Sequence, residues 1–128
     1  DQLNLPVYDD FRAPERLFGR VETRDGRSLE GVLVYDLDEA MDFELLDGRN
    51  GNISYRIPFK YVQEIEPKNY KYTWVKLSGG TELVLGTMCD VTTANDGVLV
   101  FRAGGEVVYV RWRDVKRIEL WTKGKQND

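Results

Sequence analysis

The sequence predicts an all-β protein made of two small five-stranded barrels in tandem, related by a pseudo-two-fold repeat. The first observation behind this prediction is an internal repeat. Residues 56–66 (RIPFKYVQEIE) recur as residues 110–119 (VRWRDVKRIE), and in both copies basic and aromatic residues precede the pattern Val-x-x-Ile-Glu. Val62 corresponds to Val115, 53 residues later in the chain. A period of this length is typical of one supersecondary unit used twice.

The other two observations concern periodicity. Short runs of alternating apolar and polar residues, the period of a half-buried strand, are separated by turns that contain glycine. No run keeps the i, i+3, i+4, i+7 spacing of an amphipathic helix for more than about two turns. The chain therefore favours strands and predicts no substantial helix.

Composition limits the size and the partners of this protein. Its 128 residues, 41% of them hydrophobic, suffice for one domain or for two small units that share a core. The net charge is −4, and the lysines and arginines are scattered. Because a nucleic-acid backbone is normally bound by clustered positive charge, a nucleic acid is not the expected partner. No apolar run is long enough to cross a bilayer, so no membrane insertion is expected.

The chain contains no histidine and a single cysteine, Cys89. The missing histidine excludes Ser-His and Cys-His nucleophile pairs and removes the commonest general base and transition-metal ligand. One cysteine cannot form an intramolecular disulfide, and we expect Cys89 to be a small buried residue. No catalytic residue and no cofactor is predicted, because a barrel of this size rarely forms a cleft deep enough for a catalytic carboxylate pair.

Residues 1–15 form the predicted N-terminal arm. Leu3, Leu5 and Val7 occupy alternate positions, but nearby prolines disfavour a central strand. We expect an extended arm that lies against the body of the protein; the alternative is a tail that binds a partner. Because the chain does not open on Met, we also expect that a signal peptide or another segment has been removed upstream.

The first predicted barrel comprises residues 16–67. Its five strands are predicted at residues 17–23, 28–35, 41–46, 53–57 and 62–66. Asp25 and Gly26 form a tight hairpin turn, in which glycine accepts a positive φ. Gly31 lies inside the second strand and predicts a bulge or a sharp bend there. Residues 58–61 are expected to form one 3₁₀ turn before the closing strand.

The second predicted barrel comprises residues 68–121 and follows the same order. Its strands are predicted at residues 72–77, 81–87, 98–101, 107–110 and 115–121, with a 3₁₀ turn at 112–114. Residues 122–128 are predicted to be a disordered polar tail. Five short strands with a 3₁₀ turn before the last are typical of an SH3-like or Sm-like barrel.

Residues 21–36 (VETRDGRSLEGVLVYD) resemble the first motif of Sm proteins, in which an apolar strand, a turn glycine, a second glycine and an aspartate follow one another. The second repeat is similar through Gly80, Gly86, Asp90 and Asn95. The resemblance implies a bent-strand barrel. The Arg-Gly pair of the second Sm motif is missing here, since the corresponding stretches are RIP and RWR. The RNA binding of Sm proteins is therefore not expected.

The stretch EGxLVYDLDEAxDFELLDG, followed by ISYRIPF, also resembles small bacterial proteins without an assigned activity, many of which are exported. This resemblance implies no function. It favours a periplasmic or secreted location.

Two acidic loops supply candidate binding residues. These candidates are Asp36, Asp38 and Asp42 in the first repeat and Asp90, Asn95 and Asp96 in the second. Carboxylates around a loop suit Ca²⁺, which takes six to eight oxygen ligands. The spacing is not that of a known calcium loop, so a solvated acidic rim is the alternative and no metal is assigned.

Aromatic residues supply a second set of candidates. Tyr70, Tyr72 and Trp74 are predicted to share one face of a strand, as either the seam between the two barrels or an exposed platform for a peptide or a sugar. Phe59 and Trp112 occupy matching places in the two repeats, and we expect both to anchor the core.

The sequence thus predicts a non-catalytic binding or structural module. We expect it to bind a protein partner, or to self-associate, through barrel edges and loops, because edge strands commonly accept a peptide strand. The alternative is a small ligand, a glycan or Ca²⁺ at the acidic loops. Nucleic-acid binding of the Sm type ranks third.

Overall fold

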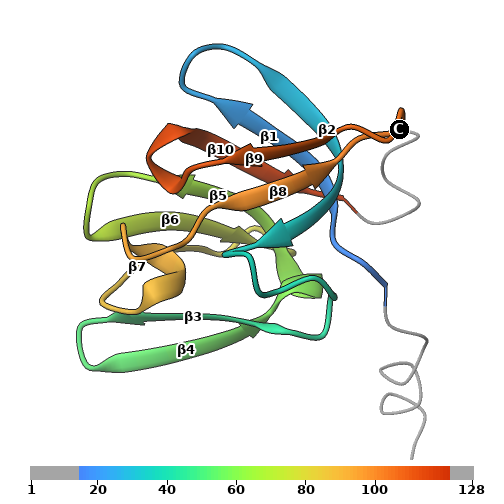
Figure 1. Cartoon of the computed structure of the whole chain (residues 1–128). Coiled ribbons are helices and arrows are strands. Elements are labelled where there is room, and N and C mark those ends of the chain that lie inside the picture. Colours follow the sequence, from blue (N-terminus) through green and yellow to red (C-terminus); the bar gives the residue numbers. More distant parts are fainter. Residues whose placement is uncertain (1–14, 122–128) are drawn as a thin grey trace, which may run out of the picture.

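The computed structural model describes residues 15–121, which form ten antiparallel strands in one sheet (Figure 1). The strands are β1 (Phe18–Thr23), β2 (Ser28–Tyr35), β3 (Leu45–Asn50), β4 (Ile53–Pro58), β5 (Val62–Pro67), β6 (Tyr72–Leu77), β7 (Glu82–Gly86), β8 (Val98–Phe101), β9 (Val107–Val110) and β10 (Val115–Leu120). Single 3₁₀ turns form η1 (Phe59–Tyr61), η2 (Cys89–Val91) and η3 (Trp112–Asp114). The predicted all-β class is confirmed. Within residues 15–121 no helix is long and apolar enough to cross a membrane.

Most strands lie where the sequence predicts them, but the third strand of the first repeat does not. It is predicted over residues 41–46, whereas β3 begins at Leu45. The Glu44 side chain explains the difference, because its Oε1 accepts the N–H groups of Ala40 and Met41 at 2.7 and 2.9 Å. These bonds hold the preceding residues in a turn instead of a strand.

The sheet pairs strands of the two predicted repeats with each other. The strand order is β4-β3-β7-β6-β5-β10-β1-β2-β8-β9. The first half of the sheet, β10-β1-β2-β8-β9, and the second half, β5-β6-β7-β3-β4, therefore each contain strands from both repeats. No strand pairing within residues 15–121 joins β4 to β9, so this sheet is open. Two tandem barrels, each closed by its own repeat, are not confirmed.

The halves join where β5 pairs with β10, through Ile65 opposite Ile118 and Glu64 opposite Glu119. Both isoleucines are fully buried. The hairpins β1-β2 and β3-β4 lie at opposite ends of the molecule (Figure 1). One hydrophobic core runs through both halves.

Three aromatic rings occupy the centre of this core. Phe59 of η1 and Trp112 of η3 are 1% and 4% exposed, and both pack on Tyr35 at the end of β2. Their ring centroids lie 5.2 and 5.8 Å from that of Tyr35. The prediction that Phe59 and Trp112 anchor the core is confirmed.

Gly31 is required by a close backbone approach. A Cβ built on Gly31 would lie 2.1 Å from the carbonyl oxygen of Phe101 in β8. The predicted bulge at Gly31 is wrong, because the pairing of β1 with β2 is regular there. One edge of β2 pairs with β1 from Ser28 to Val32, and the other edge pairs with β8 from Val32 to Tyr35.

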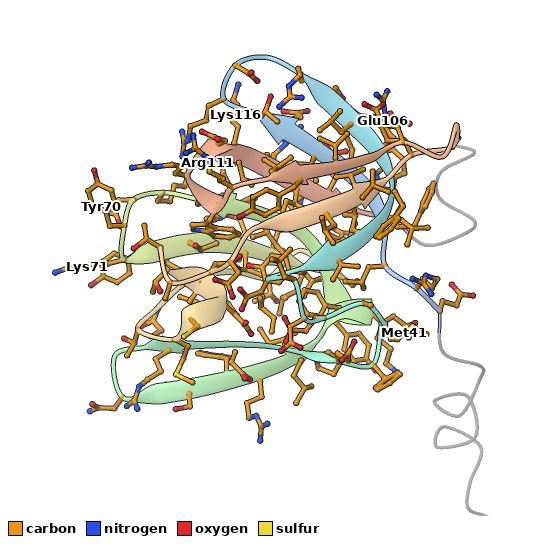
Figure 2. The ribbon with its side chains drawn as sticks, in the orientation of Figure 1. Met41, Tyr70, Lys71, Glu106, Arg111 and Lys116 are labelled. Carbon is orange, nitrogen blue, oxygen red and sulfur yellow. The ribbon has the colours of Figure 1, made fainter. Side chains whose placement is uncertain are left out.

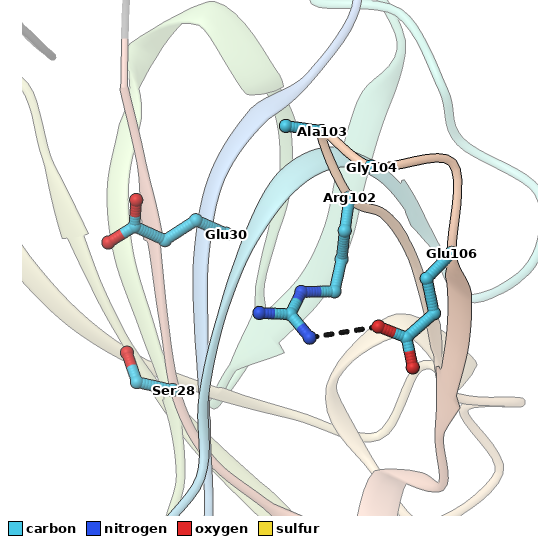
Figure 3. Close-up of a pocket in the computed structure, with 6 residues that line it drawn as sticks. All are labelled: Ser28, Glu30, Arg102, Ala103, Gly104 and Glu106. Atoms are coloured by element: carbon cyan, nitrogen blue, oxygen red, sulfur yellow. Dashed lines mark hydrogen bonds and ion pairs between the residues drawn. The ribbon is translucent and has the colours of Figure 1, made fainter.

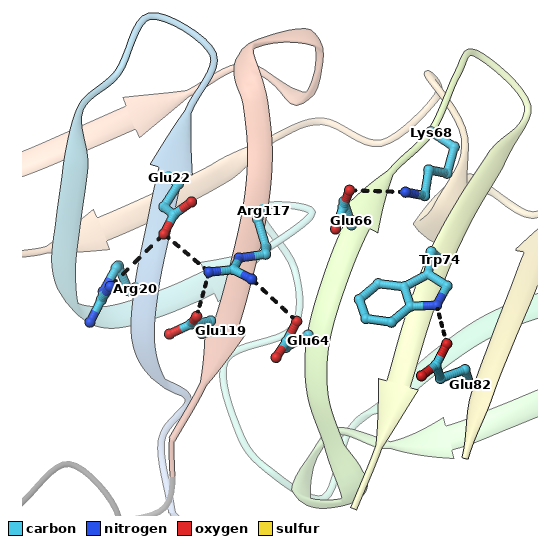
Figure 4. A network of polar contacts seen from close by, with 9 residues as sticks. All are labelled: Arg20, Glu22, Glu64, Glu66, Lys68, Trp74, Glu82, Arg117 and Glu119. Carbon is cyan, nitrogen blue, oxygen red and sulfur yellow. Dashed lines mark hydrogen bonds and ion pairs between the residues drawn. The ribbon is translucent and has the colours of Figure 1, made fainter. Parts of the chain in front are cut away.

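An ion-pair network covers the outer surface where the two halves meet (Figure 4). The Arg117 guanidinium of β10 lies 3.3 Å from Glu22, 3.6 Å from Glu64 and 2.8 Å from Glu119. Arg20 joins the network through Glu22. The network ties β1, β10 and β5 together side by side, which is a structural role.

Each end of the described chain is attached to the sheet. The N–H of Leu17 donates to the carbonyl of Ala40 at 3.0 Å, and that of Trp121 donates to Phe18 at 2.7 Å. The rings of Phe18 and Trp121 also pack on each other. Residues 1–14 of the predicted arm and the predicted tail, 122–128, lie outside the described residues.

Candidate functional site

The two predicted acidic loops meet at one place. Carboxylate oxygens of Asp36, Glu39 and Asp90 lie within 4.8 Å of one another. The loop after β2 leads from the first half of the sheet to the second, and the loop after β7 leads back. The β2-β3 and β7-β8 connections therefore run between the same two halves in opposite directions, and they pass beside each other. We call these three residues the acidic cluster.

Main-chain hydrogen bonds hold two of the three carboxylates. Oδ1 of Asp36 accepts the N–H of Asp96 at 2.5 Å, and Oδ2 of Asp90 accepts the N–H of Asp47 at 2.9 Å. Oε1 of Glu39 is buried and has no hydrogen-bond partner among the described residues. The cluster is thus bonded at its two aspartates and unsatisfied at its glutamate.

The loop around Asp90 is pinned to the core. The Tyr35 hydroxyl donates to the carbonyl oxygen of Asp90 at 2.5 Å, and Nδ2 of Asn95 donates to the same oxygen at 2.9 Å. Oδ1 of Asn95 accepts the N–H of Gly97 at 2.7 Å. Asn95, a predicted site residue, is buried by these bonds and orders the loop.

Burial raises the pKa of every carboxyl group in the cluster. It raises the pKa of Glu39 to about 8 and that of Asp90 to about 7, and the neighbouring negative charges add to the effect. The pKa of Asp36 is also raised, mainly by burial. The carboxylate oxygens of Asp36 and Asp90 lie so close together that their charges repel unless one of the two groups carries a proton. The cluster can therefore hold a proton at neutral pH or offer three oxygen ligands to a cation.

Asp38 and Asp42, also predicted as binding residues, lie apart from the acidic cluster. Asp38 is exposed on the loop. Oδ1 of Asp42 accepts the N–H of Glu15 at 3.1 Å, and its N–H donates to the carbonyl of Glu15. Asp42 therefore fixes the start of the described chain. Glu39 was not among the predicted site residues, although its place in the same acidic loop could have suggested it.

The three predicted aromatic residues lie on the outside of the sheet. Tyr70 precedes β6 and is 78% exposed, and it projects from the β5-β6 loop beside Lys71 (Figure 2). Tyr72 is exposed, and the half-buried Trp74 donates its Nε1–H to Glu82 at 3.1 Å. The alternate residues of β6, Thr73 and Val75, face the core. These aromatics do not form the seam between the halves, which the β5-β10 pairing provides.

An apolar surface that is not among the predicted sites covers the outer side of β2, β8 and β9. Its side chains are aligned by the strand pairing and belong to Val32, Val34, Leu99, Phe101, Val107 and Tyr109. Phe101, Val107 and Tyr109 are exposed, and the other three are partly buried. We call this surface the β2-β8-β9 outer face. The sequence signal was present, because residues 98–101 and 107–110 are apolar at every position and not only at alternate ones.

A shallow polar hollow lies beside this face, between the β1-β2 and β8-β9 hairpins (Figure 3). It encloses about 450 Å³. Glu30 lines one side, and an Arg102–Glu106 ion pair of 2.9 Å lines the other. The hollow gives the apolar face a charged rim.

Cys89 corrects a further expectation, because it is exposed at the start of η2 instead of buried. η2 turns its two following residues inward, so that Asp90 and Val91 are buried.

Comparison with known proteins adds no relative. No protein-family model matches this chain, and neither a curated protein nor a solved structure is significantly similar to it.

Proposed function

We propose that this protein is a non-catalytic module that binds a protein partner on its β2-β8-β9 outer face. The observation that carries the proposal is the exposure of that face. Val107 and Tyr109 are 51% and 50% exposed, and the aligned Phe101 lies between them and β2. A contiguous exposed apolar surface of this kind marks an interaction site.

The surroundings of the face have the composition of a protein interface. Its centre is apolar and contains two aromatic residues, Phe101 and Tyr109, a class that is enriched at interfaces. Its rim carries charges of both signs, including Glu30, Arg102 and Glu106. An apolar centre with a mixed polar rim suits a partner whose contact surface is itself apolar at the centre. A phosphate-rich partner would require clustered positive charge instead.

Site-specific photo-crosslinking tests the proposal. We expect a photoreactive amino acid at position 101 to capture a partner. The same amino acid at position 72, which is exposed on β6, should not capture that partner. The purified partner should bind the wild-type protein and Tyr72→Lys with equal affinity. It should bind Phe101→Lys at least tenfold more weakly. Equal capture at both positions, or unchanged affinity of Phe101→Lys, would overturn the proposal.

We also infer that the fold is a strand-exchanged form of two Sm-like or SH3-like barrels. When the strands of each repeat are numbered 1 to 5 along the chain, both halves of the sheet have the strand order 5-1-2-3-4. In each half, strands 1 and 2 come from one repeat and strands 3, 4 and 5 come from the other. This regular order supports the resemblance of residues 21–36 to the first Sm motif. A solved structure in which each half superposes on such a barrel would test it.

The alternative function is cation binding at the acidic cluster. It is favoured by the meeting of two loops from different repeats and by the unpartnered Oε1 of Glu39. Calorimetric titration with Ca²⁺ distinguishes the two functions. Cation binding predicts heat that is lost in Asp90→Asn and kept in Asp38→Asn, which changes the same surface outside the cluster. No heat with the wild-type protein would remove Ca²⁺ from consideration.

A further inference from the structure

Among the residues that the structure describes, β4 and β9 each leave one edge of the sheet unpaired, and these two edges differ. β4 carries Arg56 and ends at Pro58, and a charge or a proline normally protects an edge strand from pairing with another chain. β9 has the sequence Val-Val-Tyr-Val, with neither feature. An unprotected apolar edge is a site where another strand adds.

The hairpin fixes which main-chain groups of β9 are free. The N–H of Arg102 donates to the carbonyl of Glu106 at 2.8 Å, which closes the β8-β9 hairpin. Hydrogen-bonded and non-hydrogen-bonded pairs alternate along an antiparallel ladder. Val108 and Val110 therefore bond to β8, whereas Val107 and Tyr109 direct their N–H and C=O groups away from it.

We propose that a second copy of this chain pairs with β9, antiparallel, about a two-fold axis at Val108. Such an axis stands perpendicular to the sheet, so the outer faces of both copies lie on the same side. In this register Val107 of each copy lies opposite Tyr109 of the other. The outward N–H and C=O groups of Val107 then form reciprocal hydrogen bonds with those of Tyr109 in the other copy. An axis at Val107 or Tyr109 would instead leave some of these groups beyond the end of the paired strands.

The side chains also suit this register. Val108 points toward the core but stays partly exposed, because no strand lies beyond it. The same residue of the second copy would cover it. On the outer side Val107 would pack beside Tyr109, an aromatic and β-branched pair that stabilises sheets. Glu106 would lie opposite Val110, so no like charges face each other.

The pairing joins two β2-β8-β9 outer faces into one continuous surface. The dimer does not depend on the proposed partner, because the face uses side chains and the edge uses main-chain groups. The two proposals can therefore fail separately.

Disulfide trapping tests the register. In a Cys89→Ser background, Val108→Cys would place its two cysteines in a non-hydrogen-bonded pair, with Cα atoms about 4.5 Å apart, within disulfide reach. Tyr109→Cys is the matched control. It is more exposed, but its Cα atoms would lie roughly 8 Å apart across the axis. We expect a disulfide dimer from Val108→Cys and little from Tyr109→Cys. A disulfide dimer from Tyr109→Cys and little from Val108→Cys would overturn the register, because random collisions favour the more exposed cysteine.

Sedimentation velocity of the full chain across a dilution series tests the dimer itself. Val107→Pro removes a free N–H that β8 does not use, and edge strands tolerate proline at such positions. We expect the wild-type protein and Val107→Ile to dimerise and Val107→Pro to remain monomeric with an unchanged circular dichroism spectrum. A wild-type protein that stays monomeric, or a Val107→Pro that dimerises, would overturn the dimer. Neither result bears on partner capture at position 101.

Discussion

At the residue scale, the acidic cluster determines how stability responds to pH. Asp90 is only 8% exposed and faces Asp36 and Glu39. Folding raises the pKa of Asp90 from 3.8 to about 7 and that of Glu39 from 4.5 to about 8. A carboxyl group with a raised pKa favours folding while it is protonated. Its contribution to the free energy of unfolding is complete below its ordinary pKa. That contribution is lost as the pH rises through the pKa of the group in the folded protein.

We therefore expect the free energy of unfolding to fall between pH 5 and pH 8. Asp90→Asn keeps an acceptor for the Asp47 N–H and cannot ionise, so it should stabilise the protein at pH 8. Each pKa unit corresponds to about 1.4 kcal/mol, so the gain should exceed about 1 kcal/mol. Urea unfolding in EDTA at both pH values measures this. A variant less stable than the wild type at pH 8 would contradict the role of the cluster.

Gly31 gives a second prediction at this scale. Its φ is 158°, and a Cβ would lie 2.1 Å from the Phe101 carbonyl oxygen. We expect Gly31→Val to lose more than about 4 kcal/mol of stability, at the severe end of single substitutions, because backbone cannot move aside as a side chain can. Thermal unfolding measures the loss. Gly104→Val is the control, since a Cβ at Gly104 meets nothing within 4 Å.

At the element scale, η1 and η3 perform the same task in the two repeats. Each places one aromatic residue, Phe59 or Trp112, against Tyr35 before the chain enters β5 or β10. A 3₁₀ turn of three residues has little stability of its own. Its buried aromatic residue therefore holds it in place and fixes where the closing strand begins.

We expect Trp112→Ala to reduce the free energy of unfolding by about 3–5 kcal/mol, as for other buried aromatic residues. Phe43→Ala removes an aromatic residue that is exposed, and should change stability by less than about 0.5 kcal/mol. Chemical denaturation of both variants makes the comparison. Equal losses would show that η3 does not anchor the core.

At the scale of the whole molecule, the exchange of strands makes each repeat depend on the other. β2 of the first repeat pairs with β8 of the second, and β3 pairs with β7. Neither repeat alone can pair its strands in this way. Both repeats should therefore unfold in one cooperative transition.

Cutting the chain between Pro67 and Lys68 tests this dependence. Fragments 1–67 and 68–128 should each lack a cooperative unfolding transition, and an equimolar mixture should regain the spectrum of the intact protein. Titration of one fragment against the other, followed by circular dichroism, gives the stoichiometry. If each fragment folded alone, its repeat would close its own barrel and the exchanged pairing would be wrong.

The sequence by itself determined the local structure of this protein. Alternating residues and turn glycines predict most strands, and the matching positions of Phe59 and Trp112 indicate that both belong to the core. These features act over a few residues, so local spacing reveals them. The candidate acidic residues Asp36 and Asp90 were also visible, as charges in loops.

Only the tertiary structure decided which strands pair, because a strand's alternation shows which face is buried but not which neighbour it bonds. The exchange of β3 and β8 follows from that choice. The exchange brings Asp36, Glu39 and Asp90 together and aligns Phe101 with Val107 on the outer face. Both candidate surfaces combine residues far apart in the sequence, and the pairing of distant strands is what creates them.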